Sequence, residues 1–166
     1  KRILDVIEIY ALVLKKADAR LLLVGDGPDR CAAEIRCREL GIESKVTFLG
    51  KVINPIEPLK VSDLFLLPSN AESFGLAALE AMASGVPVVS SNAGGIPELN
   101  KSGVSGFLRN VGDVQGMAKD ALTVIENTES LKHFKKEAKK HSEHFKSDLV
   151  LPKYLALYIK VLNGKE

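Results

Sequence analysis

Apolar residues recur along the chain with two different periods, which predict alternating helices and strands. Residues 3–14 place apolar side chains at i, i+3 and i+4 positions, the spacing of an amphipathic helix. Residues 19–24 form a short continuous apolar run that ends at a glycine, as a buried strand does. Helical spacing returns over residues 29–40 and stops at Gly41, a common helix C-cap. Further strands are predicted at 46–49, 64–67, 86–90 and 105–108, and short helices at 55–61, 74–83 and 96–100.

From residue 114 onward the pattern is helical, and it divides the chain into a body and a tail. Breaks are expected near 127–128 and 146–147, with a further one at Pro152. We therefore expect one domain over residues 1–146 and a separate C-terminal helix over 147–166. The tail helix carries an apolar stripe, part of which should be exposed and could pair two copies in a homodimer.

Continuous apolar strands separated by helices are typical of a parallel sheet buried on both faces. Right-handed crossovers then predict an α/β fold with one doubly wound, Rossmann-like sheet and a helical C-terminal tail. Such sheets bind ligands beyond the carboxyl ends of their strands. The loops that follow the predicted strands are rich in Gly, Pro, Ser or Asn, and they span 25–30, 50–55, 68–75 and 91–97.

Composition and charge exclude several functions. The 166 residues carry a net charge of +2, and no apolar run is long enough to span a membrane. Residues 128–166 hold nine lysines and five acids, which favours a solvated helix face over nucleic-acid binding. Cys31 and Cys37 fit no metal or redox spacing and suggest reduced thiols in the cytoplasm. The three histidines lie in the lysine-rich helices, away from the loops, and predict no metal site.

The segment from Glu72 to Glu80 is the most informative part of the sequence. A strand ends near Pro68, and a helix begins near residue 74, so its free N–H groups and positive dipole end face the strand-end loops. This is an anion site suited to a diphosphate, and Gly75 would let a ligand approach the backbone. Glu80 lies in an almost wholly apolar helix, where we expect a buried carboxylate that ribose hydroxyls would satisfy. A Glu that faces solvent is the alternative interpretation.

The motif Glu72-x7-Glu80 within ESFGLAALEAMASGVPVV, followed by GGIPE at 94–98, resembles the signature of a large glycosyltransferase family. These are the family 4 retaining enzymes, with two facing Rossmann-like domains in the GT-B arrangement. The resemblance spans about 30 residues in order and spacing, and extends more loosely over the whole chain. It implies the C-terminal, donor-binding domain of an enzyme that moves N-acetylglucosamine from a UDP-sugar to a small acceptor such as L-malate, without a bound metal or other cofactor.

The resemblance also implies roles for individual positions. Glu72 corresponds to the acid that contacts the donor sugar, and Lys1 to the lysine that binds the donor phosphates. Glu80 corresponds to the acid that holds the ribose. The remaining donor-binding positions are Val52 beside the base, Phe74, Gly75, Leu76 and Ala77 at the helix start, and Gly25 at the border of the crevice.

Two features of the family are missing from this sequence. The family arginine that binds phosphate precedes the lysine matched by Lys1, and the acceptor-binding domain with its histidine is also absent. The chain alone is therefore expected to bind nucleotide weakly and to be inactive without an N-terminal domain in cis. The alternatives are a nucleotide-sugar epimerase or synthase of the same architecture, and a non-catalytic nucleotide-binding module.

A dinucleotide site at residues 25–30 is disfavoured. The sequence GDGPDR has two glycines after a strand but lacks the third glycine of the fingerprint, and Pro28 alters the turn. No acid follows at the expected distance in a clear βαβ unit. The turn is compatible with a crevice border or with simple strand-to-helix geometry.

Overall fold

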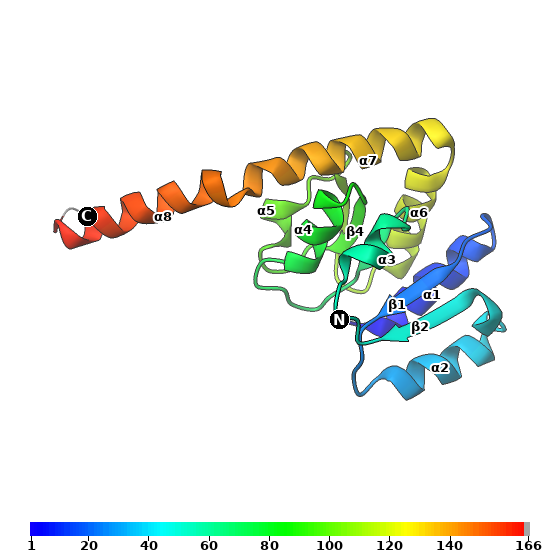
Figure 1. The fold of residues 1–166 in the computed structure, drawn as a ribbon. Coiled ribbons are helices and arrows are strands. Elements are labelled where there is room, and N and C mark those ends of the chain that lie inside the picture. The colour runs from blue at the N-terminus through cyan, green and yellow to red at the C-terminus, as the bar shows by residue number, and fades with distance from the viewer. Residues whose placement is uncertain (165–166) are drawn as a thin grey trace.

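The computed structural model describes residues 1–164, and it places parallel strands among helices (Figure 1). The strands are β1 (Leu21–Val24), β2 (Val46–Gly50), β3 (Phe65–Leu67), β4 (Val88–Ser91) and β5 (Gly106–Arg109). The helices are α1 (Ile3–Leu14), α2 (Arg30–Glu39), η1 (Glu43–Lys45), α3 (Ile56–Lys60), α4 (Leu76–Ala83), α5 (Ile96–Leu99), α6 (Val114–Ile125), α7 (Thr128–Ser142), η2 (Glu143–Phe145) and α8 (Ser147–Leu162).

The strands form two sheets instead of the single sheet expected from the sequence. β1 pairs with β2, while β3, β4 and β5 pair in that order, and every pairing is parallel. Parallel pairing with flanking helices confirms the predicted α/β class. The ladders stop between β1 and β3, because no backbone hydrogen bonds join these two strands among residues 1–164.

Helices cover the larger sheet on both faces. Successive residues of β4 point in opposite directions, so that Val88 packs with α4 and Val89 packs with α1 and α6. All four residues of β4 are buried, as expected of the central strand in a doubly covered sheet. The two valines and the two serines of this strand are thus enclosed from both faces.

The predicted breaks between the C-terminal helices are confirmed near 127–128 and 146–147. Asn127 caps the start of α7 by accepting a hydrogen bond from the Ser130 N–H at 2.9 Å. The 3-10 turn η2 separates α7 from α8. At Pro152 no break occurs, and α8 continues through it.

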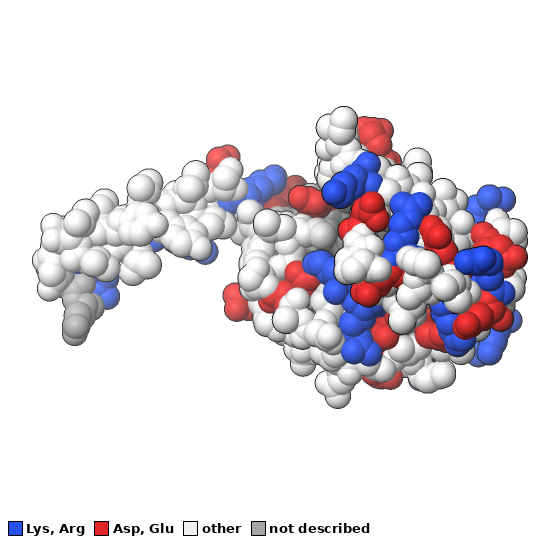
Figure 2. All heavy atoms as spheres, turned by 90° about the horizontal axis from the view of Figure 1, so that it is seen from below, with Lys and Arg blue, Asp and Glu red and all other residues white. Residues whose placement is uncertain are grey.

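Helix α8 projects away from the rest of the molecule (Figure 1). None of its residues is buried, and apolar side chains such as Leu155 and Tyr158 are more than half exposed. The space-filling view shows the helix largely free of charge, whereas acidic and basic residues mix over the body (Figure 2). Within residues 1–164, no helix combines the length and apolar character that a membrane crossing requires.

Candidate functional site

Two glycines hold the loop between β3 and α4 in place. A Cβ on Gly94 would lie 1.8 Å from the Glu72 carbonyl oxygen, and one on Gly95 would lie 2.4 Å from that of Ser73. The Gly95 N–H donates to the Glu72 carbonyl at 3.1 Å. Only glycine permits this close backbone contact, so the turn after β4 fixes the loop that carries Glu72.

Gly75 sets the start of α4 through its backbone. Its φ of 91° is left-handed, and a Cβ would meet Ile96 at 3.3 Å inside the protein. Backbone conformation and packing against α5 therefore both require a glycine at this position. Within residues 1–164, the N–H groups of Gly75, Leu76 and Ala77 have no hydrogen-bond acceptor. They are the free donors of a helix start.

The side chains at this helix start differ in exposure. Phe74 is half-buried and packs edge-on against Phe145, with ring centroids 5.8 Å apart. Leu76 is 66% exposed. A ligand that binds the free N–H groups could therefore pack a sugar ring or another apolar group against this leucine.

Glu72 and Lys1 lie together at this site. The Glu72 carboxylate, only 11% exposed, accepts hydrogen bonds from Lys1 Nζ and, at 2.8 Å, from Ser69 Oγ. Burial opposes ionisation of Glu72, but the hydrogen bonds from Lys1 and Ser69, with the positive charge of Lys1, outweigh it and lower its pKa. The residues predicted to contact sugar and phosphate thus form an ion pair in the free protein.

Arg2 positions Lys1, a role that the sequence interpretation missed. Its guanidinium donates to Asp5 at 2.7 Å in the first turn of α1 and to Asn70 Oδ1 at 3.0 Å in the loop after β3. The start of α1 is therefore tied to the loop that carries Glu72. The only signal in the sequence was the adjacency of Arg2 to a predicted phosphate-binding lysine.

The expectation of a buried Glu80 is wrong. Its side chain is exposed on the same face of α4 as Leu76, four residues earlier, and has no ion pair or hydrogen bond within residues 1–164. The apolar residues of α4 that are buried are Ala78, Ala81 and Met82. Because the carboxylate stays hydrated, it costs nothing in the free protein and is accessible to a ligand.

The carboxyl ends of β1 and β2 form a second part of the strand-end surface. The Gly25 N–H donates to the Gly50 carbonyl at 2.8 Å, and space beside Gly25 is open. Asp26, Gly27 and Lys51 line a pocket of about 280 Å³ there. Val52 follows in the loop and is half-buried. The predicted positions Gly25 and Val52 thus lie in loops at the same edge of this sheet.

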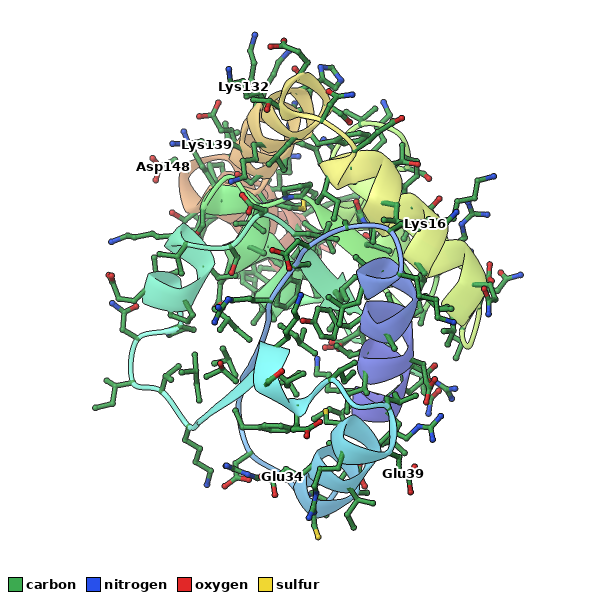
Figure 3. The ribbon with its side chains drawn as sticks, turned by 90° about the vertical axis from the view of Figure 1, so that its right-hand side faces the viewer. Lys16, Glu34, Glu39, Lys132, Lys139 and Asp148 are labelled. Atoms are coloured by element: carbon green, nitrogen blue, oxygen red, sulfur yellow. The ribbon has the colours of Figure 1, made fainter. Side chains whose placement is uncertain are left out.

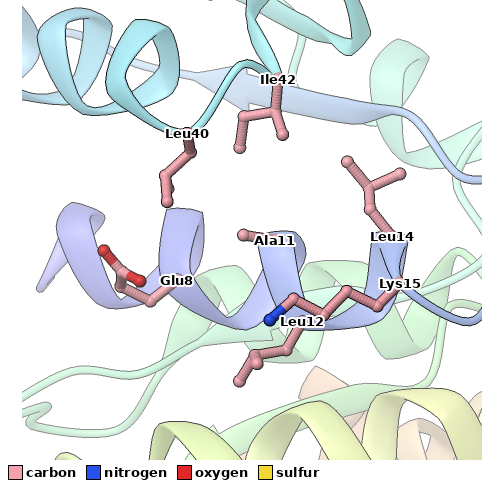
Figure 4. Close-up of a pocket in the computed structure, with 7 residues that line it drawn as sticks. All are labelled: Glu8, Ala11, Leu12, Leu14, Lys15, Leu40 and Ile42. Carbon is pink, nitrogen blue, oxygen red and sulfur yellow. The ribbon is translucent and has the colours of Figure 1, made fainter.

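A second pocket, of about 290 Å³, lies between α1 and the end of α2, away from these loops (Figure 4). Apolar side chains such as Leu12 and Leu40 line much of it. Its acid, Glu8, accepts a hydrogen bond from Arg36 at 2.5 Å. The pocket lacks converging polar groups and is not the candidate site.

The lysines of the C-terminal helices face solvent. Lys132 and Lys139 extend from the outer side of α7 (Figure 3), and both are exposed. Lys135 pairs with Asp63 at 2.6 Å. In the part of the chain that the structure describes, no three His, Cys, Asp or Glu residues gather as metal ligands. Cys31 and Cys37 are both free thiols.

Comparison with known proteins agrees with this geometry. The family described as "Glycosyl transferases group 1" matches residues 1–141. N-acetyl-alpha-D-glucosaminyl L-malate synthase of Bacillus anthracis is 42% identical over 99% of this chain and 45% of its own length. The 2-deoxystreptamine N-acetyl-D-glucosaminyltransferase of Niallia circulans is 33% identical over 87% of this chain and 38% of its own.

Solved structures show the same fold. HepE of Anabaena in complex with UDP superimposes with a TM-score of 0.81, at 30% identity over 93% of this chain and 44% of its own. A TarM variant of S. aureus, in complex with fondaparinux, alpha-GlcNAc-glycerol and UDP, gives 0.88 at 27% identity over 95% and 33%. The fold is thus the one that these glycosyltransferases share. The chain belongs to the glycosyl transferases group 1 family, and it spans less than half the length of these relatives.

Proposed function

We propose that this chain is the donor-binding domain of a retaining glycosyltransferase. The full-length enzyme transfers N-acetylglucosamine from a UDP-sugar to a small hydroxyl acceptor such as L-malate. The name of the Bacillus anthracis relative gives the corresponding product, N-acetylglucosaminyl L-malate. One observation carries the proposal. Free N–H groups begin α4 directly after the loop in which Glu72 pairs with Lys1, and Gly94 and Gly95 pack against the backbone of that loop.

These groups suit the chemistry of a diphosphate leaving group. The bond from the sugar carbon to a diphosphate oxygen of the UDP-sugar is replaced by one to the acceptor oxygen, and UDP and the proton of the acceptor hydroxyl are released. The N–H groups of Leu76 and Ala77, with the Lys1 ammonium, would stabilise negative charge that grows on the diphosphate. Glu72, freed from Lys1, could then accept hydrogen bonds from sugar hydroxyls.

In this proposal the ribose lies at Glu80 on α4, and the base lies beside the loop after β2. Glu80 is exposed one turn into α4, and in this proposal its carboxylate accepts the ribose hydroxyls. The base lies against the backbone near Val52, beyond the end of β2, with Gly25 bordering the crevice. Neither step calls for a bound metal or other cofactor.

The tail helix is assigned to contacts outside this domain. In the proposal, residues 147–166 cross to an N-terminal, acceptor-binding domain of the same protein, and residues 165–166 lie outside the described part. The exposed apolar face of α8 supports this, because water-facing leucines and tyrosines on a projecting helix call for a partner. The competing partner is a second copy in a homodimer. The free thiols are in keeping with a cytoplasmic enzyme.

The activity is tested on the full-length protein with UDP-N-acetylglucosamine and L-malate. The expected result is a glycoside with retained anomeric configuration, seen by mass spectrometry and NMR, and a rate that falls in Glu72→Ala. Epimerised nucleotide sugar without transfer would replace the proposal with an epimerase. UDP binding with no turnover of any acceptor would identify a binding module.

The ribose contact is tested by calorimetry with UDP. Glu80→Ala should weaken binding by about 1–3 kcal/mol, the cost of losing a hydrogen-bonded carboxylate partner. Glu129→Ala is the matched control, since Glu129 is an exposed acid on α7. Equal affinity of the Glu80 variant and the unmodified protein would remove Glu80 from the donor site.

A further inference from the structure

A buried serine lies behind the Glu72 carboxylate. Ser69 lies two residues after β3, is completely buried, and donates a hydrogen bond from its hydroxyl to Glu72 Oε1 at 2.8 Å. In the described part of the chain, the only other side chain that donates to this carboxylate is Lys1, which is 64% exposed. Glu72 is therefore held by the lysine from the solvent side and by the serine from the protein interior.

The backbone of Ser69 is anchored on both sides. Its N–H donates to the Leu67 carbonyl at 2.9 Å, which makes a tight turn at the end of β3. Its carbonyl accepts a hydrogen bond from Ser91 Oγ, which also donates, at the longer distance of 3.4 Å, to the Leu67 carbonyl. Ser91 is the last residue of β4 and is completely buried. Ser69 is therefore tied to the central strand of the larger sheet, and its hydroxyl has a fixed position.

The fixed hydroxyl becomes important when the donor diphosphate is bound. Under the proposed function, on which this inference rests, the Lys1 ammonium leaves Glu72 for the diphosphate. The charged groups that face Glu72 are that ammonium and, in the 166-residue chain, the α-amino group of the same residue. The other neighbours of Glu72, Ser69 and the Gly94–Gly95 turn, carry no charge. Because burial opposes ionisation of the carboxylate, Ser69 is then the remaining side-chain donor that favours its charged form.

We propose that Ser69 is a positioning residue for sugar transfer. Its hydroxyl keeps Glu72 ionised and oriented after Lys1 has moved to the diphosphate, so that the carboxylate accepts hydrogen bonds from the sugar hydroxyls. A hydrogen bond from a fixed donor to a charged acceptor is stronger than one between neutral groups. Ser69 itself touches neither sugar nor phosphate, because it is completely buried. It acts through Glu72 alone.

Ser105 is a matched control within the same sheet. It is also completely buried, and its hydroxyl donates to Asn100 Oδ1 at 3.0 Å. It lies directly before β5, at the amino ends of the strands, whereas Ser69 lies beyond the carboxyl end of β3. Replacing either serine by alanine removes one buried hydroxyl from this sheet. Only the substitution at Ser69 removes a donor from Glu72.

The pH dependence of transfer by the full-length protein, with UDP-N-acetylglucosamine as donor, tests the role. In Ser69→Ala the pH at which kcat falls to half on the acid side should rise by about one unit, because the carboxylate loses a donor to its charged form. Affinity for UDP should change by less than about twofold, since a buried hydroxyl does not reach the diphosphate. Ser105→Ala should leave the acid side of the profile in place. An unshifted profile in Ser69→Ala overturns the inference, whereas absence of transfer by the unmodified protein refutes the proposed function.

A second arm observes Glu72 without any substrate. Lys1→Met removes the ammonium, as the diphosphate is proposed to do, and the Glu72 carboxyl is titrated by ¹³C NMR with Glu72→Gln as the assignment control. Adding Ser69→Ala should raise the midpoint of this titration by about one pH unit, a change of about tenfold in proton affinity. Equal midpoints overturn the inference, whether or not the protein transfers sugar. A raised midpoint in a protein that transfers no sugar confirms the hold on Glu72 and refutes the proposed function alone.

Discussion

The β3–β5 sheet and the β1–β2 sheet differ in how fully they are built. In the larger sheet, Asn100 donates to the Val88 carbonyl, Ser90 Oγ and the Phe107 carbonyl at 3.0, 2.9 and 3.1 Å, and it accepts from Ser105. The smaller sheet is half-exposed and has one comparable polar anchor, Tyr10. The central strand of the larger sheet is fully buried between helices, whereas the strands of the smaller sheet remain partly exposed to solvent.

Among the substitutions that test this difference between the sheets, Gly106→Ala should cause the largest loss of stability. A Cβ at Gly106 would lie 1.8 Å from the Val88 carbonyl oxygen, in backbone that cannot move without disturbing β4. We expect a loss of about 4 kcal/mol in the free energy of unfolding, measured by urea titration. The matched control, Gly27→Ala, has no atom within 4 Å of the new Cβ and should change stability by less than about 0.5 kcal/mol. Similar losses in both would refute the contrast.

Asn100→Ala should give the next largest effect. It removes the amide that donates to two carbonyls and a hydroxyl of the β3–β5 sheet in a buried site, at a cost of about 3 kcal/mol. Tyr10→Phe removes the hydroxyl that donates to Ala19 or Lys45 beside the smaller sheet, and should cost about 1 kcal/mol. Thermal and urea unfolding of both variants give the comparison. If Tyr10→Phe costs as much as Asn100→Ala, the smaller sheet is as tightly built as the larger.

The smallest expected change in stability comes from acid, which should weaken the ion pair between Lys1, just before α1, and Glu72, in the loop after β3. Because the pKa of Glu72 is lowered in the folded state, its ion pair with Lys1 stabilises the protein above the ordinary pKa of a glutamate. That contribution is lost as pH falls through the lowered pKa. Near pH 7 the free energy of unfolding of Glu72→Gln should be lower than that of the unmodified protein by up to about 1 kcal/mol. Urea unfolding at several pH values should show that this difference disappears in acid. A difference that stays constant with pH would exclude the ion pair as its source.

The elements were largely predictable, because local patterns determine them. The helical spacing over 3–14 and the break at Asn127 match the structure, since amphipathic faces and caps act within a few residues. Sheet continuity was not predictable from runs of apolar residues, because it depends on which strand edges meet. Strand order is a property of the whole chain and not of any one segment.

The candidate site was predictable in outline and not in its detail. The loop after β3, the helix start and Lys1 do lie together, as the resemblance implied. The exposure of Glu80 was misjudged because the helix sequence is apolar, although small alanines on one side leave the other side open. The anchoring by Arg2 depends on a contact 68 residues away along the chain, which periodicity does not reveal.

The backbone contact between Gly94–Gly95 and the loop at Glu72 has a consequence for ligand affinity. The loop reaches its final shape during folding, so the entropy lost in ordering it does not reduce the affinity for a ligand. An anion that arrives at α4 meets donors already in place and needs little rearrangement of the protein to be held. Substitutions that loosen the glycine turn should therefore weaken ligands of every shape alike, without changing which ligand is preferred.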